Sequence, residues 1–348
     1  MRTSPAAAAS LALLLLGALE AHAADNPYRQ LEEIAIGGEG GWDYLSVDSA
    51  ARRLYVSHAS KVVVIDLDQD KVVGEIAPAN GVHGIAIAAD LGRGFVSNGR
   101  EATVSIVDLK TLQITGTVKT GENPDAILYE PVTHEVYAFN GRGKSATVFD
   151  ARNGEVRATI PLPGKPEFAV FDETAGRIYN NIEDTSQLVA IDPATHAVVA
   201  TWPIAPGEEA SGLALDPERH RLFVGCSNER MLMLDASNGK VIASVPIGPG
   251  VDANAYDPGT GLAFASSSDG TLTVARPEGS DTLSVVQTLQ TPRRSRTMTL
   301  DPKTHRLYVA AADFGPPASG PDGRPQRPPI VAGSFKVVVY EMARPPGH

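Results

Sequence analysis

The sequence has a single cysteine, Cys226, among its 348 residues. An intrachain disulfide is therefore excluded, so the stability of the fold has to come from packing. The same count excludes covalently attached c-type haem, which needs a Cys-x-x-Cys-His motif. Because Cys226 directly follows the β-type run Leu222–Gly225, we expect its thiol to be an inert core group rather than a reactive one.

The chain also lacks an excess of positive charge. It has 30 Lys and Arg against 41 Asp and Glu, a formal net charge of −11. A nucleic-acid partner is unlikely on this ground, since phosphate binding needs a basic surface. Arg293, Arg294 and Arg296 form the one local basic cluster, and we expect them in a solvated loop.

The N-terminal apolar stretch, Ala6 to Leu19, is too short for a membrane-spanning helix, which needs about 20 residues. Arg2 precedes it, and Ala21-His22-Ala23 fits the small-x-small rule for signal cleavage. Residues 1–23 are therefore predicted to be a signal peptide. The mature chain, 24–348, should begin near Ala24, have no membrane span, and be periplasmic or secreted.

What the chain does have is a repeat. Short β-type runs rich in branched and aromatic residues fill Leu54 to Ile76, and polar turn residues separate them. The acidic residue that ends the third run of each unit recurs at intervals of 42, 42, 42 and 43 residues, at Asp66, Asp108, Asp150, Asp192 and Asp235. Seven copies of the second run occur. This period, with four strands in each unit, predicts an all-β, seven-bladed β-propeller of antiparallel blades.

The ends of the chain predict how the ring closes. The seventh copy has only three strands, Arg296–Leu300, Arg306–Ala310 and Phe335–Tyr340. An unassigned run near the N-terminus, Arg29 to Ile36, resembles the fourth strand of the other copies. We expect it to complete the C-terminal blade, because this removes an open sheet edge that would otherwise invite aggregation.

The repeats also resemble a known family. The segment from Leu54 to Ile76, and more closely Gly94–Asn98 with Ala102–Leu109, is similar to the repeat of YVTN-type β-propeller proteins. The resemblance covers nearly the whole mature chain and implies a propeller that is exported or periplasmic. It does not imply one function, because relatives include ligand-binding scaffolds, lactonase-like and lyase-like enzymes, and haem-carrying domains.

The candidate site is a ring of polar residues at the first position of each inner strand. Counted from the start of each repeat, this position holds Asp43, His83, Asp125, Glu167, Ser211, Asp252 and Arg296. Inner strands line the central channel, so these residues should surround one of its mouths. Capping of the strands by Asp and Ser is the alternative. Capping explains Glu167, His83 and Arg296 poorly, and the sequence therefore predicts a ligand site at a charged mouth.

Three further features belong to the same face. His58 follows the second strand of blade one and should lie close to the ring. Converging carboxylates need a compensating cation, protons or Arg296. A divalent metal held by His83 and Asp125 would meet this need.

The Pro-rich segment 312–334 is a long insertion in blade seven. The alternatives for its role are a lid, a partner-docking arm, or disorder.

Two classes of function follow. The first is a binding propeller that takes a small molecule or a protein partner at the charged mouth. The second is a metal-assisted enzyme of lactonase or lyase type, with His83 as acid–base. The chain lacks local motifs such as His-Glu-x-x-His or Gly-x-Ser-x-Gly, so no catalytic residue is assigned and binding is favoured over catalysis.

Overall fold

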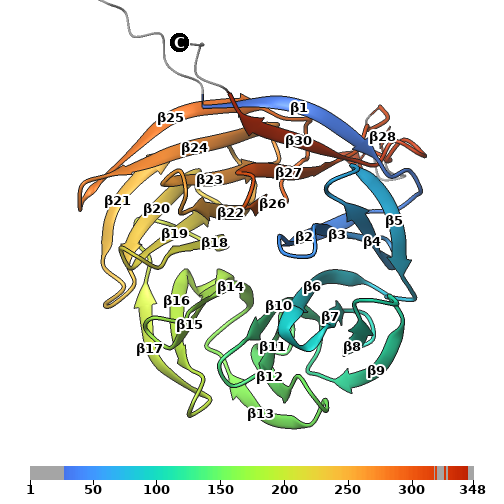
Figure 1. Cartoon of the computed structure of the whole chain (residues 1–348). Helices are drawn as coiled ribbons and strands as arrows, with labels where there is room; N and C mark the ends of the chain where they lie inside the picture. Colours follow the sequence, from blue (N-terminus) through green and yellow to red (C-terminus); the bar gives the residue numbers. More distant parts are fainter. Residues whose placement is uncertain (1–26, 317, 320–324, 327, 344–348) are drawn as a thin grey trace, which may run out of the picture.

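The computed structural model describes residues 27–343 except 317, 320–324 and 327. The predicted signal peptide, 1–23, lies outside the described residues. Seven four-stranded antiparallel sheets surround a central axis (Figure 1), which confirms the seven-bladed propeller. In the described part of the chain, no helix is long and apolar enough to cross a membrane.

Each of the first six blades uses four consecutive strands, running from the channel outward. Blade one contains β2 (Trp42–Asp48), β3 (Arg53–His58), β4 (Lys61–Asp66) and β5 (Lys71–Ile76). Blade two contains β6 (Val82–Ala88), β7 (Arg93–Asn98), β8 (Thr103–Asp108) and β9 (Ile114–Lys119). Blade three contains β10 (Pro124–Glu130), β11 (Glu135–Asn140), β12 (Ser145–Asp150) and β13 (Val156–Pro161).

Blades four to six repeat this pattern. Blade four contains β14 (Pro166–Asp172), β15 (Arg177–Ile182), β16 (Gln187–Asp192) and β17 (Ala197–Pro203). Blade five contains β18 (Ala210–Asp216), β19 (Arg221–Cys226), β20 (Arg230–Asp235) and β21 (Val241–Pro246). Blade six contains β22 (Val251–Asp257), β23 (Leu262–Ser267), β24 (Thr271–Glu278) and β25 (Thr282–Gln290). Single 3-10 turns, η1 (Ala89–Leu91) and η2 (Glu183–Thr185), interrupt two links.

Blade seven closes the ring with both ends of the chain. Its order is β26 (Met298–Asp301), β27 (Arg306–Ala311), β30 (Lys336–Met342) and β1 (Tyr28–Ala35). The predicted closure is confirmed, with β1 beginning one residue earlier than expected. Tyr28 is buried and its hydroxyl donates to the His305 carbonyl at 2.9 Å, so the first strand also fixes the inner part of the blade.

The core lies between the blades. Seven clusters of buried apolar residues occur in the described chain, one at each boundary between neighbouring blades. Between blades seven and one, for example, Leu54 and Val63 pack against Tyr308 and Val337. Cys226 is fully buried in the cluster of blades four and five. Burial raises the pKa of its thiol to about 12, which fits the inert role expected for it.

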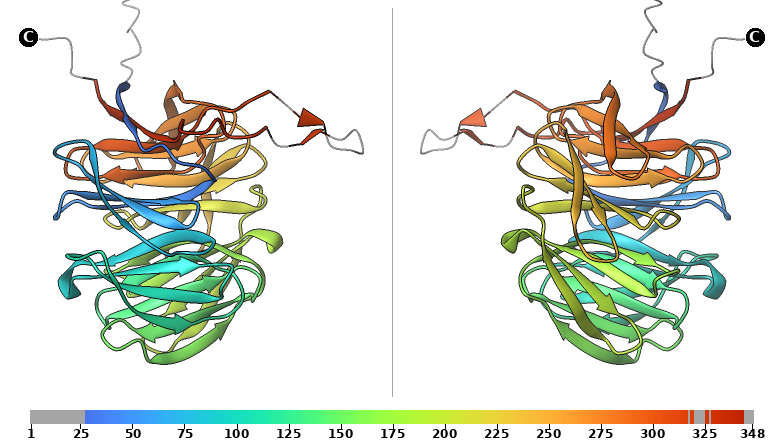
Figure 2. Two further views of the ribbon diagram at one scale, coloured as in Figure 1. Left: turned by 90° about the vertical axis from the view of Figure 1, so that its right-hand side faces the viewer. Right: turned by 90° about the vertical axis from the view of Figure 1, so that its left-hand side faces the viewer.

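The insertion of blade seven leaves the ring as an extended arm. Its described part contains an isolated bridge, Phe314 with Ile330, and a short ladder of β28 (Ala318–Ser319) with β29 (Pro325–Gln326). Figure 2 shows this arm projecting beyond the blades. Its base is held at Phe314, whose ring lies 6.2 Å from that of Trp42 and beneath the Arg294 guanidinium.

Candidate functional site at the charged channel mouth

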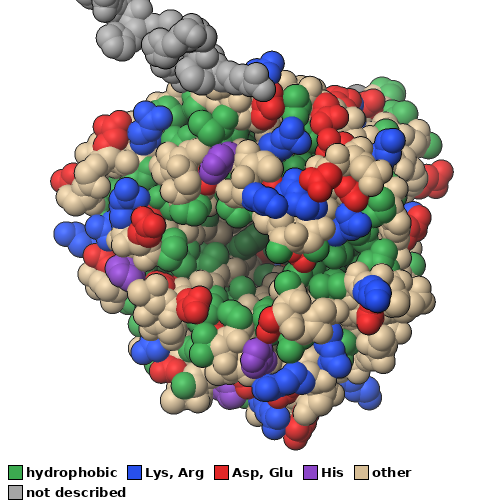
Figure 3. All heavy atoms as spheres, viewed as in Figure 1, with side chains coloured by type: hydrophobic (Ala, Val, Ile, Leu, Met, Phe, Trp, Pro, Cys, Tyr) green, Lys and Arg blue, Asp and Glu red, His purple; other side chains and the backbone are tan. Residues whose placement is uncertain are grey.

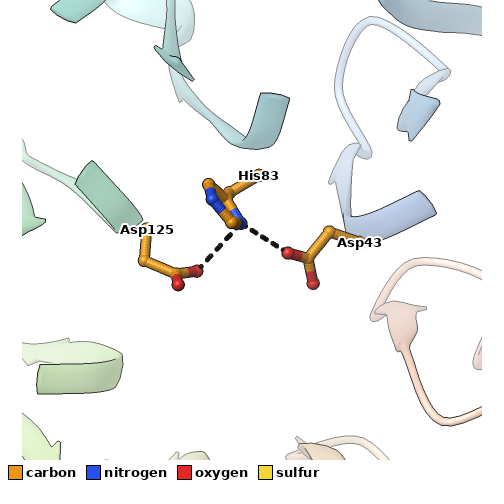
Figure 4. Close-up of side chains that lie close together, drawn as sticks. All are labelled: Asp43, His83 and Asp125. Atoms are coloured by element: carbon orange, nitrogen blue, oxygen red, sulfur yellow. Dashed lines mark hydrogen bonds and ion pairs between the residues drawn. The ribbon is translucent and has the colours of Figure 1, made fainter. Parts of the chain in front are cut away.

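Three of the predicted ring residues meet at one side of the mouth. His83 Nδ1 lies 2.7 Å from Asp43 Oδ2 and 3.3 Å from Asp125 Oδ1 (Figure 4). One ligand atom from each side chain lies within 4.8 Å of the other two. These residues come from β2, β6 and β10, the inner strands of three successive blades. We call them the Asp43–His83–Asp125 cluster.

Backbone bulges place the cluster. The register of β2 against β3 shifts between Trp42 and Leu45, and β6 and β10 shift at the corresponding positions. A bulge adds an unpaired residue and turns its side chain away from the regular alternation. Asp43, His83 and Asp125 therefore point across the mouth rather than into the cores between blades.

A second group lies beside the cluster, around Glu167. Its Oε1 is 2.6 Å from Lys165 Nζ, which also pairs with Glu183. Its Oε2 accepts a hydrogen bond of 3.4 Å from the Tyr44 hydroxyl. The Tyr44 ring reaches across the channel and packs edge-on against Phe168, with ring centroids 5.1 Å apart. Glu167 is thus tied to both a cation and a phenol.

Burial and the closeness of other carboxylates raise the pKa of three carboxyl groups at the mouth. Burial, reinforced by the charge of Asp125, raises the pKa of Glu167 to about 8. Burial also raises the pKa of Asp252 to about 7, although Arg296 opposes the shift. For Asp125 burial outweighs the His83 charge, and its pKa rises to about 6. An added positive charge would relieve this crowding.

The pKa of His83 is also raised, but by its neighbours and not by burial. Burial by itself would lower the pKa of His83, but the hydrogen bond to Asp43 and the charge of Asp125 overcome it and raise the pKa to about 9. The imidazolium is therefore the main cation of the cluster near neutral pH. A metal ion would have to displace the proton from the ring nitrogen before that nitrogen could coordinate it.

The other ring residues have separate roles. Arg296 lies before β26, not within an inner strand as predicted, because that strand begins at Met298. Its Nε is 3.2 Å from Asp252 Oδ2, which gives this side of the ring an internal ion pair. Ser211 donates to the Val251 carbonyl at 2.9 Å and so joins blades five and six. This bond reaches the next blade, so it differs from the local capping that was the alternative for the ring residues.

His58 does not join the cluster. It is 1% exposed and stacks on Phe335, with ring centroids 4.1 Å apart, in the boundary between blades seven and one. Burial lowers its pKa, so it is a neutral packing residue near the base of the arm. His58 was expected close to the ring, and its backbone does pair with Trp42, next to Asp43; its buried side chain packs on Phe335 instead of joining the three residues.

Tyr44 is the residue that sequence reasoning missed. The signal was present in the position that directly follows each ring residue. Five of the seven blades have a small side chain there: Gly84, Ala126, Gly212, Ala253 and Thr297. Only Tyr44 and Phe168 are large there, and the structure places them in contact.

The mouth above the cluster is an open cavity of about 660 Å³. Asp43 and His83 line it from the channel side. Arg100 and Arg142 line it from the links between second and third strands, and Asn123 lines it from the link between blades two and three. Its volume is that of a small-molecule site. The wall carries both signs of charge, so a bound molecule would find acidic groups at the bottom and guanidinium groups at the rim.

No family model matches the chain, and no curated protein matches it. Solved structures share its fold. A chain of Kuenenia stuttgartiensis hydrazine synthase aligns with a TM-score of 0.68 and 17% identity, covering 78% of this chain and 93% of that one. A chain of the mitotic checkpoint complex aligns with a TM-score of 0.73 and 14% identity, covering 98% and 99%. At these identities the likeness shows the fold alone. The resemblance to YVTN-type repeats stays a prediction.

Proposed function

We propose that this protein is an exported binding propeller that takes a small ligand, together with a divalent cation, at the charged channel mouth. The observation that carries the proposal is the convergence of Asp43, His83 and Asp125 from three blades. Propellers are common binding scaffolds, and the cavity above the cluster leaves room for a ligand. A protein partner at this mouth is the other form that the proposal can take.

The chemistry of the cluster suits a cation. Two carboxylates and one imidazole are ligands that Mn²⁺ and Zn²⁺ accept, and carboxylate oxygens also suit Ca²⁺. Binding has to release protons, because His83 and Asp125 must be deprotonated to coordinate. The pKa of His83 is about 9 and that of Asp125 is about 6. The affinity of the cluster for a divalent cation should therefore rise steadily between pH 6 and pH 9.

The second candidate is a metal-assisted enzyme of lactonase or lyase type. Glu167 favours it, because a carboxyl with a pKa of about 8 next to a cation site is suited to general acid–base work. If His83 ligates the metal, Glu167 takes the acid–base role in its place, with Tyr44 as its hydrogen-bond donor.

Calorimetric titration with Ca²⁺, Mn²⁺ and Zn²⁺ tests the cation site. We expect wild-type protein to bind at least one ion stoichiometrically, and the double variant His83→Ala/Asp125→Ala to lose this binding while keeping its melting temperature within a few degrees. The matched control is His134→Ala/Asp90→Ala, a pair 3.1 Å apart on the opposite face. If the control loses as much affinity as the cluster variant, or if wild type binds no ion, the proposal fails.

A further inference from the structure

The opposite end of the channel is apolar. A cavity of about 740 Å³ opens on the face that carries the links between first and second strands, and we call it the funnel. Leu45, Leu128, Leu215, Met298 and Leu300 contribute to its wall. Figure 3 shows this face, where hydrophobic side chains surround the central hollow and histidines lie further out.

The funnel continues into the channel. A smaller cavity of about 320 Å³ shares Leu45, Leu128, Phe168 and Ala169 with it and extends to Tyr44. Tyr44 also bonds to Glu167 at the charged mouth, so the Tyr44–Phe168 pair lies between the two ends of the channel. The funnel and the charged mouth are therefore distinct sites.

The wall of the funnel keeps apolar surface exposed. Leu128, Phe168, Phe171, Leu215 and Leu300 are only half-buried, unlike the fully covered residues between the blades. Removing such surface from water is favourable by roughly 25 cal/mol per Å². A concave, mainly apolar wall of this size is the usual form of a small-molecule site.

Polar side chains interrupt this wall: Glu173 and Thr174 are exposed, and Asn254 is buried. Asn254 lines the funnel, is 6% exposed, and has no hydrogen-bond partner for either amide atom among the described residues. The corresponding position of the other inner strands is apolar: Leu45, Ile85, Ile127, Ala169, Leu213 and Met298. Its Oδ1 fills the space that Gly212 and Gly225 leave, where a Cβ would approach it within 2.3 Å.

An unpartnered amide is costly in this position. Leaving a buried polar group unsatisfied is unfavourable, and an apolar residue would avoid this cost. A bound molecule that offers a donor and an acceptor would satisfy Asn254 while its apolar part covers the half-buried wall.

Three pairs of polar side chains join neighbouring blades around the funnel. His134 pairs with Asp90 at 3.1 Å and His305 with Asp257 at 2.8 Å, each across a blade boundary. Arg52 pairs with Asp301 at 2.6 Å between blades one and seven. Each of these three carboxylates therefore already has a partner in the neighbouring blade. The ion pairs also hold neighbouring blades together and keep the funnel preformed.

We propose that the funnel binds a small, neutral, mainly apolar molecule with one hydrogen-bonding head, and that the head pairs with the Asn254 amide. The site does not depend on cation binding at the charged mouth.

Fluorescence titration with N-phenyl-1-naphthylamine, a neutral apolar probe, tests the apolar part. We expect saturable binding to wild-type protein and at least tenfold weaker binding to Leu128→Asp, which places a carboxylate on the wall. Val132→Asp is the matched control, since Val132 is exposed in the same blade and outside the funnel. Absence of saturable binding to wild type, or equal affinity in the two variants, overturns the proposal.

Displacement of the probe by octanamide tests the head group. Asn254→Leu should bind the probe as wild type does and octanamide about tenfold more weakly, as expected for one lost hydrogen bond. Octanoate should compete poorly with either protein. Unchanged octanamide affinity in Asn254→Leu overturns the assignment, and this variant stays informative if Leu128→Asp does not fold. Asp125→Asn should bind the probe normally, and Asn254→Leu should bind cations normally, which separates this proposal from that for the mouth.

Discussion

Replacing Asp252 by Asn should stabilise the protein at pH 8 and leave it almost unchanged at pH 3.5. The Asp252 side chain is 15% exposed and lies 3.2 Å from Arg296. Burial raises its pKa from 3.8 to about 7 in the folded protein, despite that ion pair. The folded state therefore holds this proton more tightly than the unfolded chain does. The contribution is full below about pH 4 and is lost as the pH rises through about 7.

The magnitude follows from the shift. About three pKa units correspond to about 4 kcal/mol as an upper limit. Water in the open mouth reduces this cost, so we expect roughly 1–2 kcal/mol at pH 8. For a chain of this length, 1 kcal/mol changes the melting temperature by about 1.5 °C, which gives a gain of about 1.5–3 °C. At pH 3.5 the gain should be close to zero, because the carboxyl is then mostly protonated in the unfolded chain as well as in the folded state.

Thermal unfolding at both pH values, in chelator-treated buffer, measures the effect. Asp281→Asn is the control, because it removes the same charge from an exposed turn between β24 and β25. A control variant that gains as much as Asp252→Asn would assign the effect to net charge rather than to the mouth. A melting temperature at pH 8 that is unchanged or lower in Asp252→Asn would refute the reasoning from burial.

The remaining predictions concern the ring, the thiol and the compartment. Deleting residues 24–37 should lower the melting temperature strongly or cause aggregation, because blade seven loses β1 and exposes an edge; unchanged melting and monomeric elution would contradict this. Cys226 should react with a thiol reagent such as DTNB only on unfolding, given full burial and a pKa of about 12; fast reaction of native protein would contradict this. Protein from the native host should begin at Ala24 and lie outside the cytoplasm, and mass spectrometry that finds an intact Met1 there would exclude cleavage.

The ring residues show how far pattern reasoning reaches. The repeat places Asp43, His83 and Asp125 at equivalent positions, which was enough to predict that they share a mouth. Their contact at 2.7 and 3.3 Å depends on bulges and on the tilt between blades, which the spacing of residues does not encode. The sequence position of His58, after the second strand of blade one, places it on the same face as the ring residues. In the structure its side chain stacks on Phe335 and does not join the cluster.

By itself the sequence determined the number of blades, their strands and the closure of the ring by the N-terminal strand. The reason is that these features depend on local β-propensity and on a period of 42 residues, both readable along the chain. Only the tertiary structure decided which polar residues meet and that Tyr44 and Phe168 divide the channel. It also decided that Asn254 finds no partner among the described residues around an apolar funnel. These depend on contacts between blades, where residues distant in sequence approach each other through space and no periodic pattern records the pairing.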